Sequence, residues 1–411
     1  MKKKLLLLTF IACILLCGCE NNNQPNVSNI TDVSQSQEVI NTDNDKNSTN
    51  SEKDLSKASN DDTTHEQTTI FLKDIYSKSN ILTGTCLSPE MLKNPDSEKL
   101  ILEQFNSITM ENAMKPEYIL NKQKSKESGE IVVEFNDDAI SMLDWCKQNK
   151  MAVRGHTLIW YSQTPDWIFY EDFDESKELV SREVMLNRME SFIKQVFDYL
   201  IDNEYADLFY AYDIVNEAWM EDKTLRDNYY RSIIGDDYLW YAFYYARLYA
   251  PDNIKLFYND YNEQYKARTI VDFTDSLVDD NGNSLIDGIG LQAHLYTLDD
   301  MNKYLKSIDI LNSTGLIIEI TELDVSLGTW QNTLDASEDN LKAQGKFYYN
   351  LINSITEKVA SGSLNLDSIT FWGFNDSLSW RKEASPLLFD KMSKPKYSFY
   401  GAALDKEHAG F

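Results

Sequence analysis

The sequence predicts an α/β protein whose single catalytic domain is a (β/α)8 TIM barrel. Eight short runs rich in β-forming residues alternate with amphipathic helical segments, and polar residues follow nearly every run. A doubly wound open sheet is the alternative. No GxGxxG sequence follows the early runs, which weakens the dinucleotide-binding form of that alternative.

The first 18 residues are typical of a bacterial export signal. Three lysines precede an apolar run from Leu5 to Leu16, which is shorter than the roughly 20 residues that span a bilayer and suits a signal peptide. The run ends in Leu-Cys-Gly-Cys, which resembles a bacterial lipobox. We therefore expect residues 1–18 to be removed and Cys19 to be acylated. An ordinary signal peptide with a chance cysteine is the alternative.

The composition of residues 19–66 predicts a disordered tether. This stretch is dense in Asn, Ser, Thr and Asp and contains no Phe, Trp or Tyr, so it cannot bury enough apolar surface to offset the entropy of ordering. The remaining residues, 67–411, are numerous enough for one domain with a substantial core. We expect a secreted protein that a lipid on Cys19 holds at the cell surface.

Charge and cysteine content exclude several classes of partner. The formal net charge of −27 at pH 7 would be repelled by phosphate backbones, so we expect no nucleic-acid partner. Cys86 and Cys146 are the only cysteines in the sequence of residues 67–411, and their spacing predicts no zinc site; their pairing stays open. We expect a monomer with no cofactor and no metal, which contacts the membrane through its lipid anchor alone.

The predicted strands span residues 81–86, 107–111, 151–156, 209–215, 254–258, 288–293, 315–320 and 368–374. Helical segments separate them, and residues 184–200 are an example. The apolar residues of that segment recur at the spacing of one helical face; they are Met185, Met189, Phe192, Ile193, Val196, Phe197 and Leu200.

Polar residues gather at the ends of these predicted strands, although the strand interiors are apolar in this interpretation. In a TIM barrel the chemistry lies where the carboxyl ends of the strands meet the following loops. Charged groups there are costly unless they are paired, hydrogen-bonded or used. The residues concerned are Glu111, Asn112, Lys115, His156, Trp160, Gln163, Asn216, Glu217, Asn259, Asp260, Gln292, His294, Glu322, Asp324, Trp372, Trp380 and Arg381.

Two carboxylates on different parts of the barrel mouth, Glu217 and Glu322, favour glycoside hydrolysis. One carboxyl group has to protonate the leaving oxygen and the other has to attack the anomeric carbon. The sequence contains no GxSxG elbow and no HExxH motif, and no Cys–His pair looks catalytic. Magnesium-dependent chemistry would require several converging carboxylates.

Six motifs surround these strand ends. They are ITMENAMK at 108–115, RGHTLIW at 154–160, YDIVNE at 212–217, GLQAH at 290–294, ITELD at 320–324 and FWGFNDSLSW at 371–380. Over about residues 70–405 the chain resembles glycoside hydrolase family 10, the family of β-1,4-xylanases. The resemblance implies endo-hydrolysis of β-1,4-xylosidic linkages in xylan or xylo-oligosaccharides, with retention of anomeric configuration.

The same resemblance implies roles for individual residues. Glu217 would be the acid/base and Glu322 the nucleophile. Asn216 would bind the 2-hydroxyl group of the sugar being cleaved, and His294 would hydrogen-bond Glu322 with support from Asp324. The sugars on the non-reducing side would be held by Glu111, Asn112, Lys115, His156 and Gln163. Gln292 would also bind the substrate, and the glycone pocket would be walled by Trp160, Trp372 and Trp380. The family usually has His where this sequence has Tyr161.

Two alternatives stay open from the sequence. One is another β-1,4-glycanase of the same clan, such as a cellulase or a mannanase. The other is a surface lipoprotein that binds glycans without cleaving them, although the set of Glu217, Glu322, His294 and Asn216 argues against it.

Overall fold

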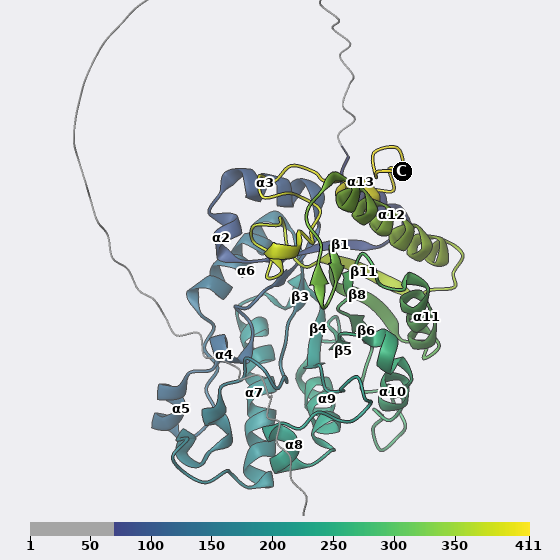
Figure 1. The fold of residues 1–411 in the computed structure, drawn as a ribbon. Coiled ribbons are helices and arrows are strands. Elements are labelled where there is room, and N and C mark those ends of the chain that lie inside the picture. The colour runs from purple at the N-terminus through teal and green to yellow at the C-terminus, as the bar shows by residue number, and fades with distance from the viewer. Residues whose placement is uncertain (1–69) are drawn as a thin grey trace, which may run out of the picture. The chain divides into compact units, whose positions relative to one another are not determined.

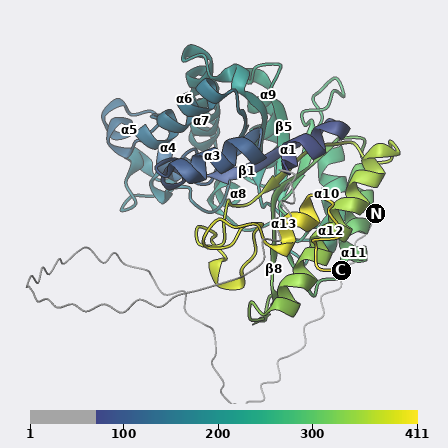
Figure 2. The same cartoon turned by 90° about the horizontal axis from the view of Figure 1, so that it is seen from above.

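The structure of the chain, a computed structural model, describes residues 70–411. The predicted signal peptide, the acylated Cys19 and the predicted tether lie outside the described residues. Residues 70–411 form a closed barrel of parallel strands with helices around it, which confirms the predicted fold (Figures 1 and 2). The order around the barrel is β11, β1, β2, β3, β4, β5, β6, β8, and pairing between β11 and β8 closes it.

The barrel strands are β1 (Leu82–Leu87), β2 (Ser107–Met110), β3 (Ala152–Gly155), β4 (Phe209–Asn216), β5 (Lys255–Asp260), β6 (Gly288–Leu291), β8 (Ile317–Ser326) and β11 (Leu366–Phe371). Three short strands lie at the barrel mouth. β7 (His294–Tyr296) pairs in parallel with the last part of β8, and β9 (Gly328–Thr329) forms an antiparallel hairpin with β10 (Asn332–Thr333).

The main helices alternate with the strands along the chain (Figure 1). They are α3 (Pro95–Gln104), α6 (Asp137–Asn149), α7 (Arg182–Asp202), α9 (Tyr238–Tyr249), α10 (Glu263–Asp275), α11 (Met301–Asn312), α12 (Glu338–Ala360) and α13 (Tyr397–Ala402). The remaining α-helices are α1 (Leu72–Tyr76), α2 (Pro89–Leu92), α4 (Pro116–Ile119), α5 (Lys122–Ser128) and α8 (Tyr229–Ile234). Several helices begin after a residue whose side chain caps the first turn, as Asn136 does by accepting a hydrogen bond from the backbone N–H of Ala139.

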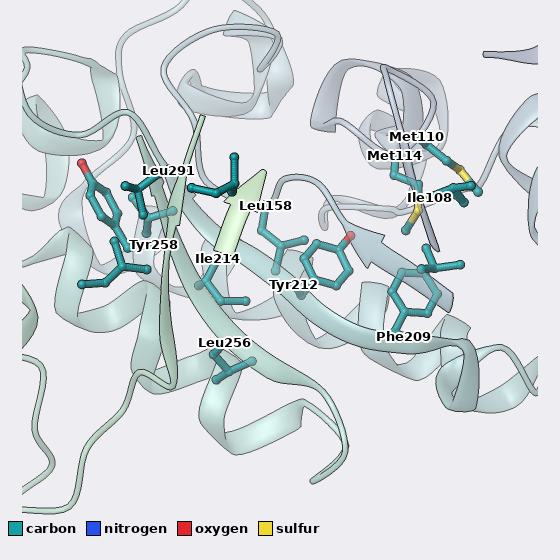
Figure 3. Packing of buried hydrophobic residues seen from close by; sticks show 14 of the residues in the cluster. Ile108, Met110, Met114, Leu158, Phe209, Tyr212, Ile214, Leu256, Tyr258 and Leu291 are labelled. Atoms are coloured by element: carbon teal, nitrogen blue, oxygen red, sulfur yellow. The ribbon is translucent and has the colours of Figure 1, made fainter. Parts of the chain in front are cut away.

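Helix α7 illustrates how the sequence pattern becomes packing. Its buried side chains are the seven that the periodicity predicts, and the helix extends two residues beyond the predicted 184–200 at each end. They pack against the strands, whose own buried side chains include Phe209, Tyr212 and Ile214 (Figure 3). Full burial of such a side chain contributes about 1.5–3 kcal/mol each, and this continuous core holds the strand ends in place.

The strand interiors are not wholly apolar, and here the expectation from the sequence was wrong. Arg154 on β3, Asp213 on β4 and Glu319 on β8 are each 1% exposed. Arg154 donates hydrogen bonds to both carboxylates, at 2.5 Å to Asp213 Oδ1. Gly290 on β6 leaves room for this cluster, because a Cβ there would lie 2.9 Å from the Arg154 guanidinium. A buried guanidinium is tolerated because it donates hydrogen bonds to two carboxyl groups.

Two further findings concern strand ends and cysteines. β8 continues to Ser326, so Glu322 and Asp324 lie within the strand. The sequence had predicted that both residues follow the end of the strand. Cys86 and Cys146 are both free and buried. Residues 70–411 form no helix that is long and apolar enough to span a bilayer.

Candidate active site

A cleft of about 720 Å³ lies at the carboxyl ends of the barrel strands. It is lined by every residue that the sequence placed in catalysis or substrate binding except Asp324, which is fully buried beside it. These residues are Glu111, Asn112, Lys115, His156, Trp160, Gln163, Asn216, Glu217, Gln292, His294, Glu322, Trp372 and Trp380. Six other residues line the cleft without a site role predicted from the sequence; they are Glu221, Tyr261, Asn262, Tyr296, Trp330 and Arg381.

Glu217 follows the last residue of β4 in a left-handed backbone conformation, with φ of 55°. Such a conformation costs a non-glycine residue on the order of 1–3 kcal/mol and persists only where neighbours hold it. The backbone N–H of Glu217 donates to the Asn259 carbonyl at 2.9 Å, and Arg226 Nε donates to the Glu217 carbonyl at 3.0 Å. The carboxylate accepts from Gln292 Nε2 at 3.0 Å and Asn216 Nδ2 at 3.3 Å.

Glu322 projects from β8 into the same cleft and is held as an anion. Its carboxylate accepts a hydrogen bond from Asn259 Nδ2 at 2.8 Å and contacts His294 Nε2 at 3.2 Å. Burial raises its pKa, but the hydrogen bonds from His294 and Asn259 and the charge on His156 outweigh burial and lower the pKa to about 2. A carboxylate that stays ionised at neutral pH is suited to attack an electrophilic carbon.

His294 lies between two carboxylates. Its Nδ1 contacts Asp324 Oδ2 at 3.0 Å, and its Nε2 faces Glu322. Burial lowers the pKa of His294, but the charge of Asp324 and the hydrogen bonds to both carboxylates raise it to about 9. Asp324 itself accepts hydrogen bonds from Trp380 Nε1 at 3.1 Å and from Arg381 Nη1 at 2.7 Å. The imidazolium is therefore fixed as a donor to Glu322.

The raised pKa of His294 predicts an alkaline loss of stability. The imidazolium stabilises the folded protein fully below the unfolded pKa of 6.5, and that contribution is lost as the pH rises through about 9. Replacing His294 by Gln should reduce the free energy of unfolding at pH 6 by up to about 3 kcal/mol, and by much less at pH 10. Urea unfolding of both proteins at the two pH values checks this, and a difference independent of pH would contradict it.

Amide side chains connect the two carboxylates. Asn259 Nδ2, which binds Glu322, also donates to Asn216 Oδ1 at 3.0 Å. Gln292 Nε2, which binds Glu217, donates to the same Asn216 oxygen at 3.3 Å. No site role was predicted for Asn259, although its place at the end of a predicted strand indicated that it could lie in the site.

One rim of the cleft is formed by the loops after β2 and β3. Lys115 Nζ donates to Gln163 Oε1 at 2.7 Å and Asn112 Oδ1 at 3.1 Å, and it lies 5.0 Å from the centre of the Trp160 ring. Burial lowers the pKa of Lys115, although the carboxylates of Glu322, Glu111 and Glu217 oppose this. These polar groups line the cleft.

Histidine and tryptophan side chains complete this part of the cleft. His156 Nδ1 contacts Asp213 Oδ2 at 2.9 Å, which ties the site to the buried Arg154 cluster. Trp372 packs its edge against His156 with ring centroids 5.6 Å apart. Trp380 stays 56% exposed and packs against His294. The tryptophans thus lie in the cleft wall rather than in the core of the barrel.

Tyr161 occupies the position at which the sequence differs from the family pattern. It is 43% exposed, and the Arg226 guanidinium lies 4.1 Å from the centre of its ring. Burial and the neighbouring Glu217 raise the pKa of its phenol to about 12. Arg226 also donates a hydrogen bond to the Glu217 carbonyl, so Tyr161 helps to position the Glu217 loop through its contact with Arg226.

Most of the chain matches a known protein family. Residues 71–404 match the sequence model of glycosyl hydrolase family 10. The chain belongs to this family. It is 36% identical over 334 residues to endo-1,4-beta-xylanase B of Butyrivibrio fibrisolvens, covering 77% of this chain and 50% of that protein. It is 36% identical over 319 residues to endo-1,4-beta-xylanase A of Caldicellulosiruptor saccharolyticus, covering 73% of this chain and 86% of that protein.

Two solved structures of similar proteins share the fold. One is the Clostridium thermocellum endo-1,4-beta-D-xylanase 10B with its CBM22-1 and GH10 modules in complex with xylohexaose. It has a TM-score of 0.72 and 32% identity, covering 81% of this chain and 67% of that chain. The endo-1,4-beta-xylanase of Caldicellulosiruptor owensensis has a TM-score of 0.70 and 34% identity, covering 82% of this chain and 99% of that chain. The family 10 chain described here spans half the length of the Butyrivibrio relative.

Proposed function

We propose that the protein is a retaining endo-1,4-β-xylanase with Glu322 as nucleophile and Glu217 as acid/base. The observation that carries this is the pairing of two differently held carboxyl groups in one cleft. Glu322 accepts a hydrogen bond from the imidazolium of His294 and is ionised, whereas Glu217 accepts hydrogen bonds from the neutral amides of Gln292 and Asn216. The names of the relatives, which are xylanases, support xylan as the substrate.

In the first step, Glu322 attacks the anomeric carbon while protonated Glu217 gives its proton to the leaving glycosidic oxygen. The bond to the leaving sugar breaks as the bond to the Glu322 carboxylate forms. The imidazolium of His294 orients the attacking oxygens, and Asn216 lies where it can bind the 2-hydroxyl group as positive charge develops on the sugar ring.

In the second step, ionised Glu217 takes a proton from a water molecule, which attacks the anomeric carbon of the glycosyl-enzyme. The ester bond to Glu322 breaks, and the product leaves with the configuration of the substrate. When the ester bond breaks, the Glu322 carboxylate again accepts hydrogen bonds from Asn259 and His294, and these donors are already in position.

Release of reducing sugar from xylan, cellulose and mannan tests the function. We expect activity on xylan that exceeds activity on the other two polymers by orders of magnitude. A preference for cellulose or mannan would identify another β-glycanase of this clan. Binding of xylan without release of sugar would identify a glycan-binding protein and reject the proposal.

The stereochemical course gives an independent prediction. A nucleophilic carboxylate requires the two carboxyl groups to lie about 5–5.5 Å apart, whereas inversion requires about 6.5–9.5 Å. Proton NMR of the first products from a xylo-oligosaccharide should therefore show the β-anomer, which mutarotation later converts to the equilibrium mixture. Initial formation of the α-anomer would mean that water attacks directly.

We also propose that the protein is held at the cell surface by a lipid on Cys19. The lipobox-like sequence and the stretch without aromatic residues that follows it support this. Replacing Cys19 by Ala should release the protein from the membrane fraction with unchanged specific activity. The matched variant Cys17→Ala should stay bound. Membrane retention of the Cys19 variant equal to that of wild type would reject the anchor.

A further inference from the structure

Trp330 lines the cleft and has no role in the mechanism above. Its side chain is 80% exposed, the highest value among the large hydrophobic residues of the described chain. An isolated exposed apolar residue is ordinary at a protein surface. This one, however, stands at the edge of the cleft that holds Glu217 and Glu322, so its exposed ring faces the region a polymeric substrate must cross.

The segment that carries Trp330 is a tight hairpin between β9 and β10. Gly328 has a φ of 99°, and a Cβ at this position would lie 2.1 Å from the Asn332 carbonyl oxygen, so the turn requires glycine. Gly328 N donates to Thr297 Oγ1 at 2.9 Å, and Leu327 N donates to the Ala384 carbonyl at 3.0 Å. Bonds to two neighbouring loops thus hold the hairpin, and the tryptophan is presented from a supported position.

The order of strands places Trp330 opposite the polar rim. In a closed barrel of eight strands, those four places apart face each other, so β3 faces β8 and β2 faces β6. Lys115 and Gln163, which follow β2 and β3, lie on the rim that the family resemblance assigns to the non-reducing side. Trp330 follows β8, so it lies across the cleft from the end of β3, and Tyr261 and Asn262, which follow β5, line the same cleft.

We propose that Trp330 is a stacking platform for the leaving-group part of the xylan chain, beyond the bond that is cleaved. The proposal rests on the proposed xylanase function. A xylose unit is uncharged and presents an apolar C–H face, which stacks on an indole ring. Asn262 and Glu221 line the same cleft, where Asn262 Nδ2 donates to Glu221 Oε1 at 3.0 Å, and they offer polar partners for the hydroxyl groups of a sugar. Trp330 would therefore set the preference for long chains over short ones.

The test compares two substrates in wild type, Trp330→Ala and Trp330→Phe. Xylohexaose fills both sides of the cleft, whereas an aryl β-xylobioside places only a small phenol on the leaving-group side. For Trp330→Ala we expect kcat/KM on xylohexaose to fall about three- to tenfold, with little change on the aryl glycoside. Trp330→Phe should keep most of the activity. Met392→Ala is the control, because Met392 is 77% exposed and does not line the cleft.

The position of the cut gives a second readout. With xylopentaose labelled by ¹⁸O at its reducing end, Trp330→Ala should move cleavage toward that end, because fewer sugars are then held on the leaving-group side. Equal losses on both substrates, no loss on either, or a shift toward the non-reducing end would each overturn the proposal. Should Trp330→Ala not fold, Trp330→Gln, which also removes the ring, faces the same criteria. A wild-type protein that leaves xylohexaose intact would instead reject the proposed function itself.

Discussion

Replacing Glu322 by Ala should abolish turnover of every substrate, whereas replacing Glu217 by Ala should spare the first step for activated aryl glycosides. Without Glu322 no glycosyl-enzyme forms, so we expect kcat to fall about 10⁵–10⁶-fold whatever the leaving group. Without Glu217 only proton transfer is lost, which should cost about 10²–10⁴-fold on xylan. An acidic phenol leaves without protonation, so an aryl xylobioside should give a burst of phenol followed by slow turnover.

Azide separates the two roles further. In Glu217→Ala, azide needs no general base to attack the covalent intermediate, so it should restore turnover and give the β-glycosyl azide. In Glu322→Ala, azide can attack only from the vacated side, which gives the α-azide. Glu178→Gln is the control, because this exposed carboxylate does not line the cleft. Opposite responses of the two variants would show that the assigned roles are exchanged.

Replacing Arg154 by Ala should lower the free energy of unfolding by about 3–5 kcal/mol, because it leaves buried charges without a partner. Asp213 and Glu319 both accept hydrogen bonds from this guanidinium inside the barrel. Burial already raises the pKa of Glu319 to about 7, against the opposing charge of Arg154. The loss should be smaller at pH 5 than at pH 8, because protonation of the Glu319 carboxyl group removes one of the unpaired charges.

Urea unfolding at the two pH values measures this loss. Arg268→Ala is the matched control, because Arg268 is exposed on α10, and its effect should stay within about 0.5 kcal/mol. Adding Glu319→Gln to Arg154→Ala should recover part of the stability. A loss for Arg154→Ala as small as that of the control, or one that grows as the pH falls, would contradict this account of the cluster.

The barrel could be predicted because its signals are local in the sequence. The seven buried positions of α7 recur at a helical spacing, and each barrel strand overlaps a predicted run. Strand ends were less certain. β8 continues through Glu322 and Asp324, because alternate polar side chains on a strand can point into the mouth of a barrel, whereas a polar residue after an apolar run resembles the end of a strand.

The side chains that converge on the cleft were also largely predictable, because the carboxyl ends of parallel strands share one face of a barrel. Contacts that depend on tertiary geometry were not. Nothing in the sequence around Arg154 indicates that two carboxylates from other strands will meet it in the interior. Trp330 lies beyond the end of a strand in a hairpin with no periodic pattern, so only the structure places it in the cleft.

Mass spectrometry of the covalent intermediate tests the central claim most directly. Glu217→Ala should be mixed with an activated aryl β-xylobioside, quenched in acid during the slow phase, and digested with a protease. We predict that the protein gains the mass of one xylobiosyl group, and that the modified peptide carries it on Glu322. The absence of any adduct during a burst, or an adduct on another residue, would contradict the assignment of Glu322 as the nucleophile.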